Sequence, residues 1–202
     1  MDSKEIYDYI IKIQAIAKIG LVYSKDPYAI TNYTEINNLS KKFLEDFMNV
    51  KIDRPNYFSK ETYPTPSVSV RCIILNKERN KILLVRECNS HLYSIPGGWA
   101  DLYDSPSKTA INECAQEAGA DIEVVRLIGV TDRTPFKQNT TVPEYIIMFE
   151  GKLQGNLHEH EYETDDVNWF DINNLPEMSR KLTKPEIDKY LKAAIDGTTI
   201  FD

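Results

Sequence analysis

Two glutamates, Glu113 and Glu117, stand four residues apart in the segment PSKTAINECAQEAGA, residues 106–120. On a helix, residues at this spacing project from one face about 5–6 Å apart. Their carboxylates offer the hard oxygen ligands that Mg²⁺ or Mn²⁺ prefers, and Gln116 adds an amide oxygen. An ion held there would bridge a diphosphate, offset its charge and lower the pKa of a bound water. The chemistry indicated is metal-assisted hydrolysis of a phosphoanhydride.

The surrounding residues predict the helix that must carry these side chains. Ser105 and Pro106 are typical of a helix start, as N-cap and first-turn residue. Gly119 is typical of a helix end. The face that we expect to pack on the core comprises Ile111, Cys114, Ala115 and Ala118. We therefore interpret Cys114 as a small buried hydrophobic residue, not as a reactive thiol.

A solvated helix face is the alternative interpretation of Glu113 and Glu117, because charged helical residues usually face water. Two neighbouring features favour chemistry instead. Gly97-Gly98 permits backbone conformations closed to other residues and lets a ligand approach closely. Asp104 places a further carboxylate just before the predicted helix.

Residues 96–122, PGGWADLYDSPSKTAINECAQEAGADI, resemble the Nudix box. In that motif a Gly is followed after five residues by Glu, and after seven more by Arg-Glu, an aliphatic residue, any residue, Glu-Glu, any residue and Gly. The matching positions are Gly98, Glu113, Glu117 and Gly119, and the departures are Asp104 for Glu, Asn112 for Arg and Gln116 for Glu. The resemblance implies that Glu113 and Glu117 hold Mg²⁺ or Mn²⁺ and serve catalysis, with Gln116 and Asp104 assisting.

The resemblance extends over roughly the whole chain, through TPSVSVR, KILLVRE, SIPGGWAD and VNWFDINNLP. It indicates a bacterial Nudix subgroup with a helical N-terminal region, which includes enzymes acting on CDP-choline or ADP-ribose. It implies an α/β fold, an α/β/α sandwich with a mixed sheet, and hydrolysis of a nucleoside diphosphate linked to another moiety. The altered box leaves a second hypothesis, a weak or inactive nucleotide-binding module with a regulatory role. A scaffold whose N-terminal helices form the functional surface is a third.

Further candidates lie outside the predicted helix. Arg71 and Arg86 could bind substrate phosphates, or could form ion pairs on a strand surface. Gly98 is a candidate substrate contact through its backbone. By resemblance, Glu163 lies where the family often places a general base or additional metal ligand, and Glu144 is a lesser candidate.

Aromatic and histidine residues are weaker candidates. Tyr93, Trp99 and Phe136 could stack on a nucleobase, but packing is the more common use of aromatic residues. His158 and His160 form an isolated HxH pattern in an acidic segment, for which a solvated loop is a better interpretation than a transition-metal site.

The chain divides into three predicted regions: a helical hairpin at 1–50, a proline-containing linker at 51–66, and a hydrolase domain at 67–202. Helical periodicity gives one apolar stripe of Ile6, Tyr9, Ile10, Ile13, Ala17 and Leu21, and another of Tyr33, Ile36, Leu39, Phe43 and Phe47. Two amphipathic helices cannot bury all their apolar surface alone. We therefore expect the hairpin to pack on the rest of the chain or to form a homodimer.

Period-two patterns predict strands in the remaining region. SVSVRCIIL and KILLVRE, joined by NKERN, are predicted to form a β-hairpin, and later strands are predicted at 123–132, 144–154 and 167–171. A last helix is predicted over 184–195, after Thr183 as N-cap.

The composition of the chain limits the classes of partner that it is expected to bind. The net charge of -7 argues against non-specific binding to nucleic acid or anionic membranes, but not against a small nucleotide bound through metal ions. Three cysteines without a CxxC motif favour reduced thiols. The N-terminal residues lack signal-peptide character, and no apolar run approaches the ~20 residues of a membrane span. We therefore expect a cytoplasmic protein.

Overall fold

The computed structural model describes residues 3–48, 65–100, 104–133, 135–136, 143–160 and 163–202. These residues form two compact units, which meet in the sequence between Pro66 and Ser67. Most of the predicted linker, residues 51–64, lies outside the described residues. None of the described helices is long and apolar enough to cross a membrane.

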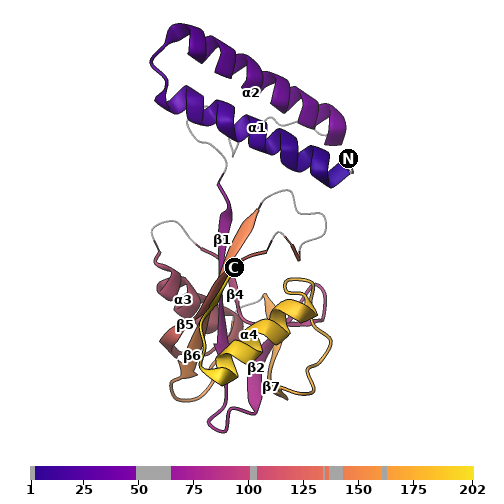
Figure 1. The fold of residues 1–202 in the computed structure, drawn as a ribbon. Helices are drawn as coiled ribbons and strands as arrows, with labels where there is room; N and C mark the ends of the chain where they lie inside the picture. Colours follow the sequence, from indigo (N-terminus) through magenta and orange to yellow (C-terminus); the bar gives the residue numbers. More distant parts are fainter. Residues whose placement is uncertain (1–2, 49–64, 101–103, 134, 137–142, 161–162) are drawn as a thin grey trace. The chain divides into compact units, whose positions relative to one another are not determined.

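The first unit is a pair of helices, α1 (Ser3–Tyr23) and α2 (Pro27–Met48) (Figure 1). The carboxylate of Asp26 accepts a hydrogen bond from the Tyr28 amide at 3.0 Å and caps the start of α2. Among the described residues, four of the six buried residues of the two helices are polar or charged. The six are Gln14, Ala17, Lys18, Asn37, Ser40 and Leu44.

The apolar stripe predicted on α2 lies mostly on the outside of this unit. Ile36, Leu39, Phe43 and Phe47 are exposed, and Leu39 is 60% exposed. On α1 the predicted stripe is largely covered, except for Tyr9, which is 59% exposed. The hairpin thus retains a large apolar surface that its own two helices do not cover.

The second unit contains eight strands and two helices among its described residues. The strands are β1 (Ser67–Ile74), β2 (Lys81–Glu87), β3 (Tyr93–Ser94), β4 (Gly97–Trp99), β5 (Ile122–Asp132), β6 (Glu144–Leu153), β7 (Thr164–Asp171) and β8 (Ile200–Phe201). The helices are α3 (Pro106–Ala118) and α4 (Lys184–Asp196). One sheet has the order β4-β1-β6-β5-β8, with β1 parallel to β6, and the other has the order β3-β2-β7.

The predicted hairpin between β1 and β2 is wrong except at its turn. The two strands meet only at the isolated bridge between Leu75 and Ile82, and then enter different sheets. The physical reason is that both edges of β1 are already taken. One edge pairs with β6 from Ser67 to Ile74, and the other pairs with β4 from Ser69 to Arg71.

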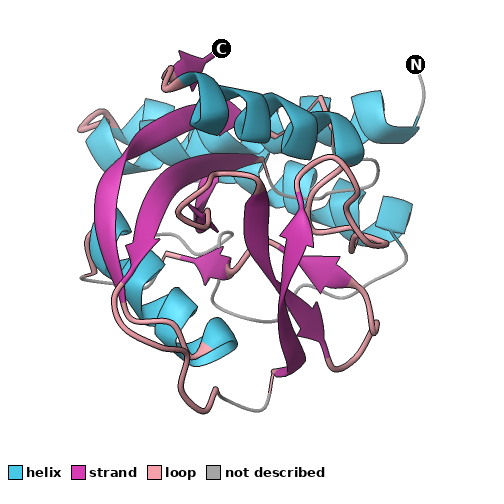
Figure 2. Cartoon of the chain, turned by 90° about the horizontal axis from the view of Figure 1, so that it is seen from below, coloured by secondary structure: helices cyan, strands magenta, loops and turns pink. Residues whose placement is uncertain are grey.

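The strands lie between α3 and α4, which confirms the predicted α/β/α sandwich with a mixed sheet (Figure 2). Alternate residues of a strand point to opposite faces. On β1, Val70 and Cys72 pack toward α3, whereas Ile73 packs toward α4. Helix α4 begins where predicted, with Thr183 as N-cap, and Glu186 accepts a hydrogen bond of 2.7 Å from the Thr183 amide.

Candidate active site

Helix α3 begins and ends as its sequence predicts. The Ser105 hydroxyl accepts a hydrogen bond from the Lys108 amide at 3.3 Å, and Gly119 adopts a left-handed conformation with φ of 56°. Cys114 is fully buried, as predicted, and its hydrogen bond with Cys72 together with burial raises the pKa of its thiol. Ile111, which was expected on the buried face, is 39% exposed, because the helix presents Glu117 to the interior instead.

The turn before α3 fixes the position of Glu117. The Gly97 amide donates a hydrogen bond of 2.8 Å to Glu117 Oε2, and the Glu117 side chain is 4% exposed. Gly97 has φ of 141°, and a Cβ there would lie 2.2 Å from the carbonyl oxygen of Val70. No other residue fits this position, so the close approach of β4 to β1 depends on glycine.

Gly98 lies directly against the second carboxylate. A Cβ at Gly98 would lie 2.4 Å from Glu113 Oε1. The absence of a side chain therefore leaves room for the Glu113 carboxylate, and the two predicted residues are neighbours in the structure.

A pocket of about 900 Å³ is lined by most of the predicted site residues. One wall comes from α3 and the glycine turn, with Gly97, Gly98, Glu113 and Glu117. A second comes from β1 and its surroundings, with Ser69, Arg71, Trp99, Arg133 and Glu144. The remaining wall includes Glu87, Ser90, Glu163, Ser179, Arg180 and Lys181.

The carboxylates in this pocket perturb one another. Burial, followed by the negative charge of Glu117 and of Glu163, raises the pKa of Glu113 to about 7, although Arg71 and Lys181 oppose the shift. In the protein alone, Glu113 is therefore partly protonated near neutral pH. A cation placed among these carboxylates would favour their ionised forms.

Arg71 is 5% exposed and lines the pocket. Its Nη1 donates a hydrogen bond of 2.5 Å to the Ile95 carbonyl, and its Nε has no hydrogen-bond partner among the described residues. Burial lowers the pKa of the guanidinium, whereas Glu117 and Glu144 raise it. Since arginine stays charged in proteins, a buried guanidinium with an unused donor is suited to an anionic ligand.

Glu163 also lines the pocket, and the residue after it is anchored to α3. The Thr164 hydroxyl donates a hydrogen bond of 2.6 Å to the Glu117 carbonyl and lies 3.0 Å from His160 Nδ1. The Cys88 amide donates to the Glu163 carbonyl at 3.1 Å. The Glu163 side chain is exposed, so it combines a fixed backbone with an exposed carboxylate at the pocket.

Glu144, a lesser candidate in the sequence, belongs to a buried charge network. Its carboxylate accepts a hydrogen bond from Ser69 and lies 3.3 Å from Arg133 Nη1. Arg133 Nε also lies 2.7 Å from Glu186 at the start of α4. These contacts place Glu144 in a buried charge network at the wall of the pocket.

Three predicted site residues are not among the described residues that line the pocket: Asp104, Gln116 and Arg86. Asp104 lies 2.6 Å from Lys108 Nζ and accepts a hydrogen bond of 3.0 Å from Asn112. Gln116 is exposed on α3. Arg86 forms an ion pair with Asp165 at 2.6 Å, as the alternative interpretation held.

Of the aromatic candidates, Trp99 lines the pocket, and it is 55% exposed. Tyr93 packs edge-on against Phe170 at 4.6 Å and donates a hydrogen bond to Asp166, so it is a packing residue. Phe136 is partly buried, and its amide donates to the Arg133 carbonyl. His158 Nδ1 lies 2.8 Å from the Glu159 carbonyl oxygen, which is a local loop contact.

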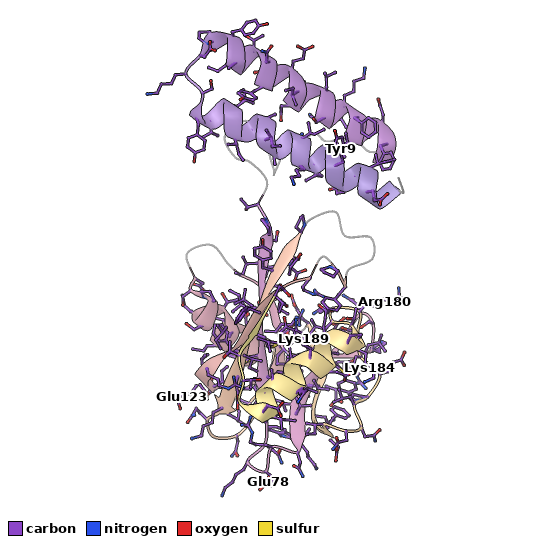
Figure 3. The ribbon with its side chains drawn as sticks, in the orientation of Figure 1. Tyr9, Glu78, Glu123, Arg180, Lys184 and Lys189 are labelled. Atoms are coloured by element: carbon purple, nitrogen blue, oxygen red, sulfur yellow. The ribbon has the colours of Figure 1, made fainter. Side chains whose placement is uncertain are left out.

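Sequence reasoning missed several residues that line the pocket, including two in the loop before α4 and one at the end of β2. Arg180, labelled in Figure 3, and the next residue, Lys181, lie in a loop with no periodic pattern that precedes α4 in the sequence. Glu87 ends β2 and accepts a hydrogen bond from Ser90 at 3.0 Å. Position at a strand end was the one signal that could have singled out Glu87.

Comparisons with known proteins show the family of the chain. A family model described as the NUDIX domain matches residues 65–193, well over half of the chain. The chain belongs to the Nudix family of hydrolases. A second model, described as a UDP-X-like N-terminal oligomerisation domain, matches residues 4–54. Both findings confirm the resemblance inferred from the Nudix box and the helical N-terminal region.

Relatives of this Nudix protein match between about two thirds and all of its length. One is named "Putative ADP-ribose pyrophosphatase YjhB", from Bacillus subtilis, and is 31% identical over 95% of this chain and 94% of its own. A crystal structure of UDP-X diphosphatase is 25% identical, with a TM-score of 0.64, and covers 100% of this chain and 99% of its own. An ADP-ribose pyrophosphatase structure from Streptococcus suis is 30% identical, with a TM-score of 0.59, over 68% of this chain and 100% of its own.

The donor set of the Nudix box here fits a Mg²⁺ or Mn²⁺ ion that keeps part of its water shell. Among the described residues, no three histidine, cysteine, aspartate or glutamate side chains are grouped so as to hold a metal ion by themselves. Mg²⁺ commonly takes only one or two protein carboxylates and completes its shell with waters and substrate phosphates. Glu113 and Glu117, at one wall of an open pocket, suit that mode of binding.

Proposed function

We propose that this protein hydrolyses the diphosphate bridge of a nucleoside diphosphate linked to a second moiety, in a reaction that requires Mg²⁺ or Mn²⁺. One observation carries the proposal: Glu113 and Glu117 share a pocket with the buried guanidinium of Arg71. The carboxylates are suited to a divalent cation, and the guanidinium is suited to phosphate oxygens. A metal-bridged diphosphate satisfies both at once.

Each residue has a distinct part in this proposal. Glu113 and Glu117 hold the ion, which when bound supplies charge neutralisation and a lowered pKa of water. Arg71 binds non-bridging phosphate oxygens, and the bare backbone of Gly98 allows the substrate to approach. Glu163 accepts the proton of the attacking water, since its exposed carboxylate faces the same pocket. Asp104, Gln116 and Arg86 have no part in the proposed site.

The proposed substrate class follows the relatives. Those named above are an ADP-ribose pyrophosphatase and a UDP-X diphosphatase. Both names describe a nucleoside diphosphate joined to a further group. Trp99, half-exposed at the pocket, is the side chain best placed to stack on the base.

The deciding experiment combines a substrate screen with a matched pair of variants. ADP-ribose, UDP-glucose and CDP-choline are incubated with the protein in Mg²⁺ or Mn²⁺, and nucleoside monophosphate release is measured. Glu117→Gln keeps an oxygen that can accept the Gly97 hydrogen bond but removes the charge, so we expect kcat/KM to fall at least about a hundredfold. Glu123→Gln, on β5 at the edge of the unit, is the control and should change little (Figure 3). Absence of hydrolysis from the wild-type protein with all substrates would overturn the proposal.

A second candidate function is a nucleotide-binding module without efficient catalysis. The exposed position of Gln116 and the engagement of Asp104 with Asn112 and Lys108 favour it, because the site has fewer carboxylates than the usual box. The combined variant Gln116→Glu with Asn112→Arg separates the two hypotheses. A large gain of hydrolysis from a silent wild-type protein would support the binding module.

We further propose that the protein is a homodimer, joined through the helical hairpin. The match of residues 4–54 to an oligomerisation domain supports an oligomer, and the uncovered apolar side chains on α2 supply a surface for it. Burial of such a surface is favourable by roughly 25 cal/mol per Å².

A further inference from the structure

The ammonium group of Lys181 lies between two carboxylates of the pocket. Its Nζ is 3.7 Å from Glu117 Oε1 and 3.4 Å from Glu87 Oε1. The other oxygen of Glu117 accepts the Gly97 hydrogen bond. Lys181 therefore lies beside the one Glu117 oxygen that the turn leaves for a cation.

The backbone that carries Lys181 is held firmly. The Ser179 amide donates to the Tyr93 carbonyl at 2.7 Å, and the Tyr93 amide donates to the Glu177 carbonyl at 3.1 Å. The Lys181 amide donates to the Ser179 hydroxyl at 3.3 Å. In contrast, the Lys181 side chain is 39% exposed. A fixed backbone with a long, exposed side chain lets the ammonium change partners without moving the loop.

Glu87 can retain the ammonium when Glu117 no longer does. Burial raises the pKa of Glu87, but hydrogen bonds from Ser179 and Ser90 and the charge of Lys181 outweigh burial, so its pKa lies below the usual value. Glu87 is therefore ionised at neutral pH. Glu87 ends β2 and is not one of the two glutamates of α3 in the proposed metal-holding pair.

A divalent ion at Glu117 and the ammonium at its present position would repel each other, because like charges this close interact unfavourably even near water. The ammonium must therefore turn away from Glu117 when an ion binds. The pocket into which it turns is the one that receives the diphosphate in the proposed function.

We propose that Lys181 is an exchangeable counter-ion of this site. While no metal is bound, it offsets part of the negative charge of Glu117 and Glu87. Once a divalent ion occupies Glu117, the ammonium of Lys181 turns to the diphosphate oxygens of the substrate. The proposal rests on the proposed function, and it gives Lys181 opposite effects on its two ligands: competition with the metal and attraction of the substrate. A lysine that only tied the loop to α3 would not have opposite effects.

The test is Lys181→Met, which keeps the length of the side chain and removes its charge. Mn²⁺ alone is titrated into the full-length protein by calorimetry, and we expect its Kd to fall about fivefold in the variant. Methylenediphosphonate, a diphosphate that cannot be hydrolysed, is then titrated at fixed free Mn²⁺. Its Kd is expected to rise about tenfold, because a charge-assisted contact is lost. Lys184→Met, which removes an exposed ammonium paired with Asp188 on α4, is the control and should change neither Kd (Figure 3).

The outcomes separate this proposal from the proposed function. An unchanged or weaker Mn²⁺ affinity in folded Lys181→Met overturns the exchange. A Kd for methylenediphosphonate that is unchanged or lower in this variant overturns the proposed contact between Lys181 and the substrate. If wild-type protein does not bind Mn²⁺, or if Glu117→Gln binds it equally well, the metal site itself is misassigned. Should a lower unfolding temperature show that methionine disturbs the loop, Lys181→Gln gives the same test with a polar side chain.

Discussion

The side-chain amide of Asn112 donates a hydrogen bond of 3.0 Å to the carboxylate of Asp104. These are two of the three positions at which the chain departs from the Nudix box. The second oxygen of the same carboxylate lies 2.6 Å from Lys108 Nζ. Asp104 thus lies at the start of α3, where a negative charge is favourable, and not among the described residues that line the pocket. The two departures form a pair that secures the first turns of the helix.

Removing either member of this pair should lower stability without acting on the pocket. We expect Asp104→Ala and Asn112→Ala each to lower the free energy of unfolding by about 1 kcal/mol. The double variant should lose less than the sum of the two, because the residues share one hydrogen bond. Urea unfolding gives all three values. Strictly additive losses would show that the hydrogen bond contributes nothing in solution.

Arg71 and Arg86 are both candidates for phosphate binding from the sequence, and of the two only Arg71 is among the described residues that line the pocket. Arg71→Lys keeps the charge but loses the planar fork that matches phosphate, so KM for the preferred substrate should rise about tenfold. Arg86→Lys changes a residue that is paired with Asp165 outside the pocket, and KM should stay within about twofold. Steady-state kinetics of the two variants decides the matter. Equal effects on KM would contradict the placement of Arg71 as the phosphate ligand.

The raised pKa of Glu113 predicts a pH dependence for metal binding. Below about pH 7 the metal-free protein holds a proton on Glu113 that a bound ion must displace. The logarithm of the Mn²⁺ association constant should therefore rise by about one unit per pH unit below 7 and level off above it. Calorimetry between pH 5.5 and 8.5 measures this slope. In Glu113→Gln the slope should vanish, and a slope that persists would assign the proton to another group.

The same shift affects the stability of the metal-free protein. The folded pKa of Glu113 lies above its value in the unfolded chain, so the folded state binds the proton more tightly. This contribution to stability is present below about pH 4.5 and is lost as the pH rises through about 7. Saturating Mn²⁺ should reverse the trend, because the ion replaces the proton.

The proposed homodimer should be disrupted by a substitution on α2 that leaves the pocket unchanged. Phe43 lies on the exposed apolar stripe and stacks on Phe47 at a ring distance of 5.8 Å. Phe43→Glu places a charge in the proposed interface and should yield monomers in light scattering at micromolar concentration. Asn38→Glu adds the same charge on a different side of the helix and should leave the dimer intact. A dimer that survives Phe43→Glu would move the interface elsewhere.

Local signals in the sequence predicted much of this molecule. Helix α3 lies between Ser105 and Gly119 because capping residues act within a few positions. The residues of β2, β5 and β6 follow from period-two patterns. The helical repeat and the Nudix box are enough to predict that Glu113 and Glu117 line the same pocket.

Other features depend on contacts between residues far apart in the chain. Strand β2 does not pair along β1, because β6 occupies one edge of β1. Strand β6 comes 70 or more residues later in the sequence. Burial of Glu117 depends on the Gly97 amide, and the buried pairing of Arg133 with Glu186 depends on α4. Lys181 lies in a loop, where neither spacing nor periodicity marks a residue. No pattern within one short segment could have indicated these contacts.

The hydrogen bond from Thr164 to the Glu117 carbonyl has a practical consequence for engineering. It holds Thr164, the residue after Glu163, against α3. The position of the Glu163 backbone beside Glu117 therefore does not depend on the segment before Glu163. Residues 155–156, which are exposed between the anchored amides of Gln154 and His158, are therefore an insertion point. Loops of other lengths and compositions could be grafted there while Glu117 and the residue next to Glu163 stay in place.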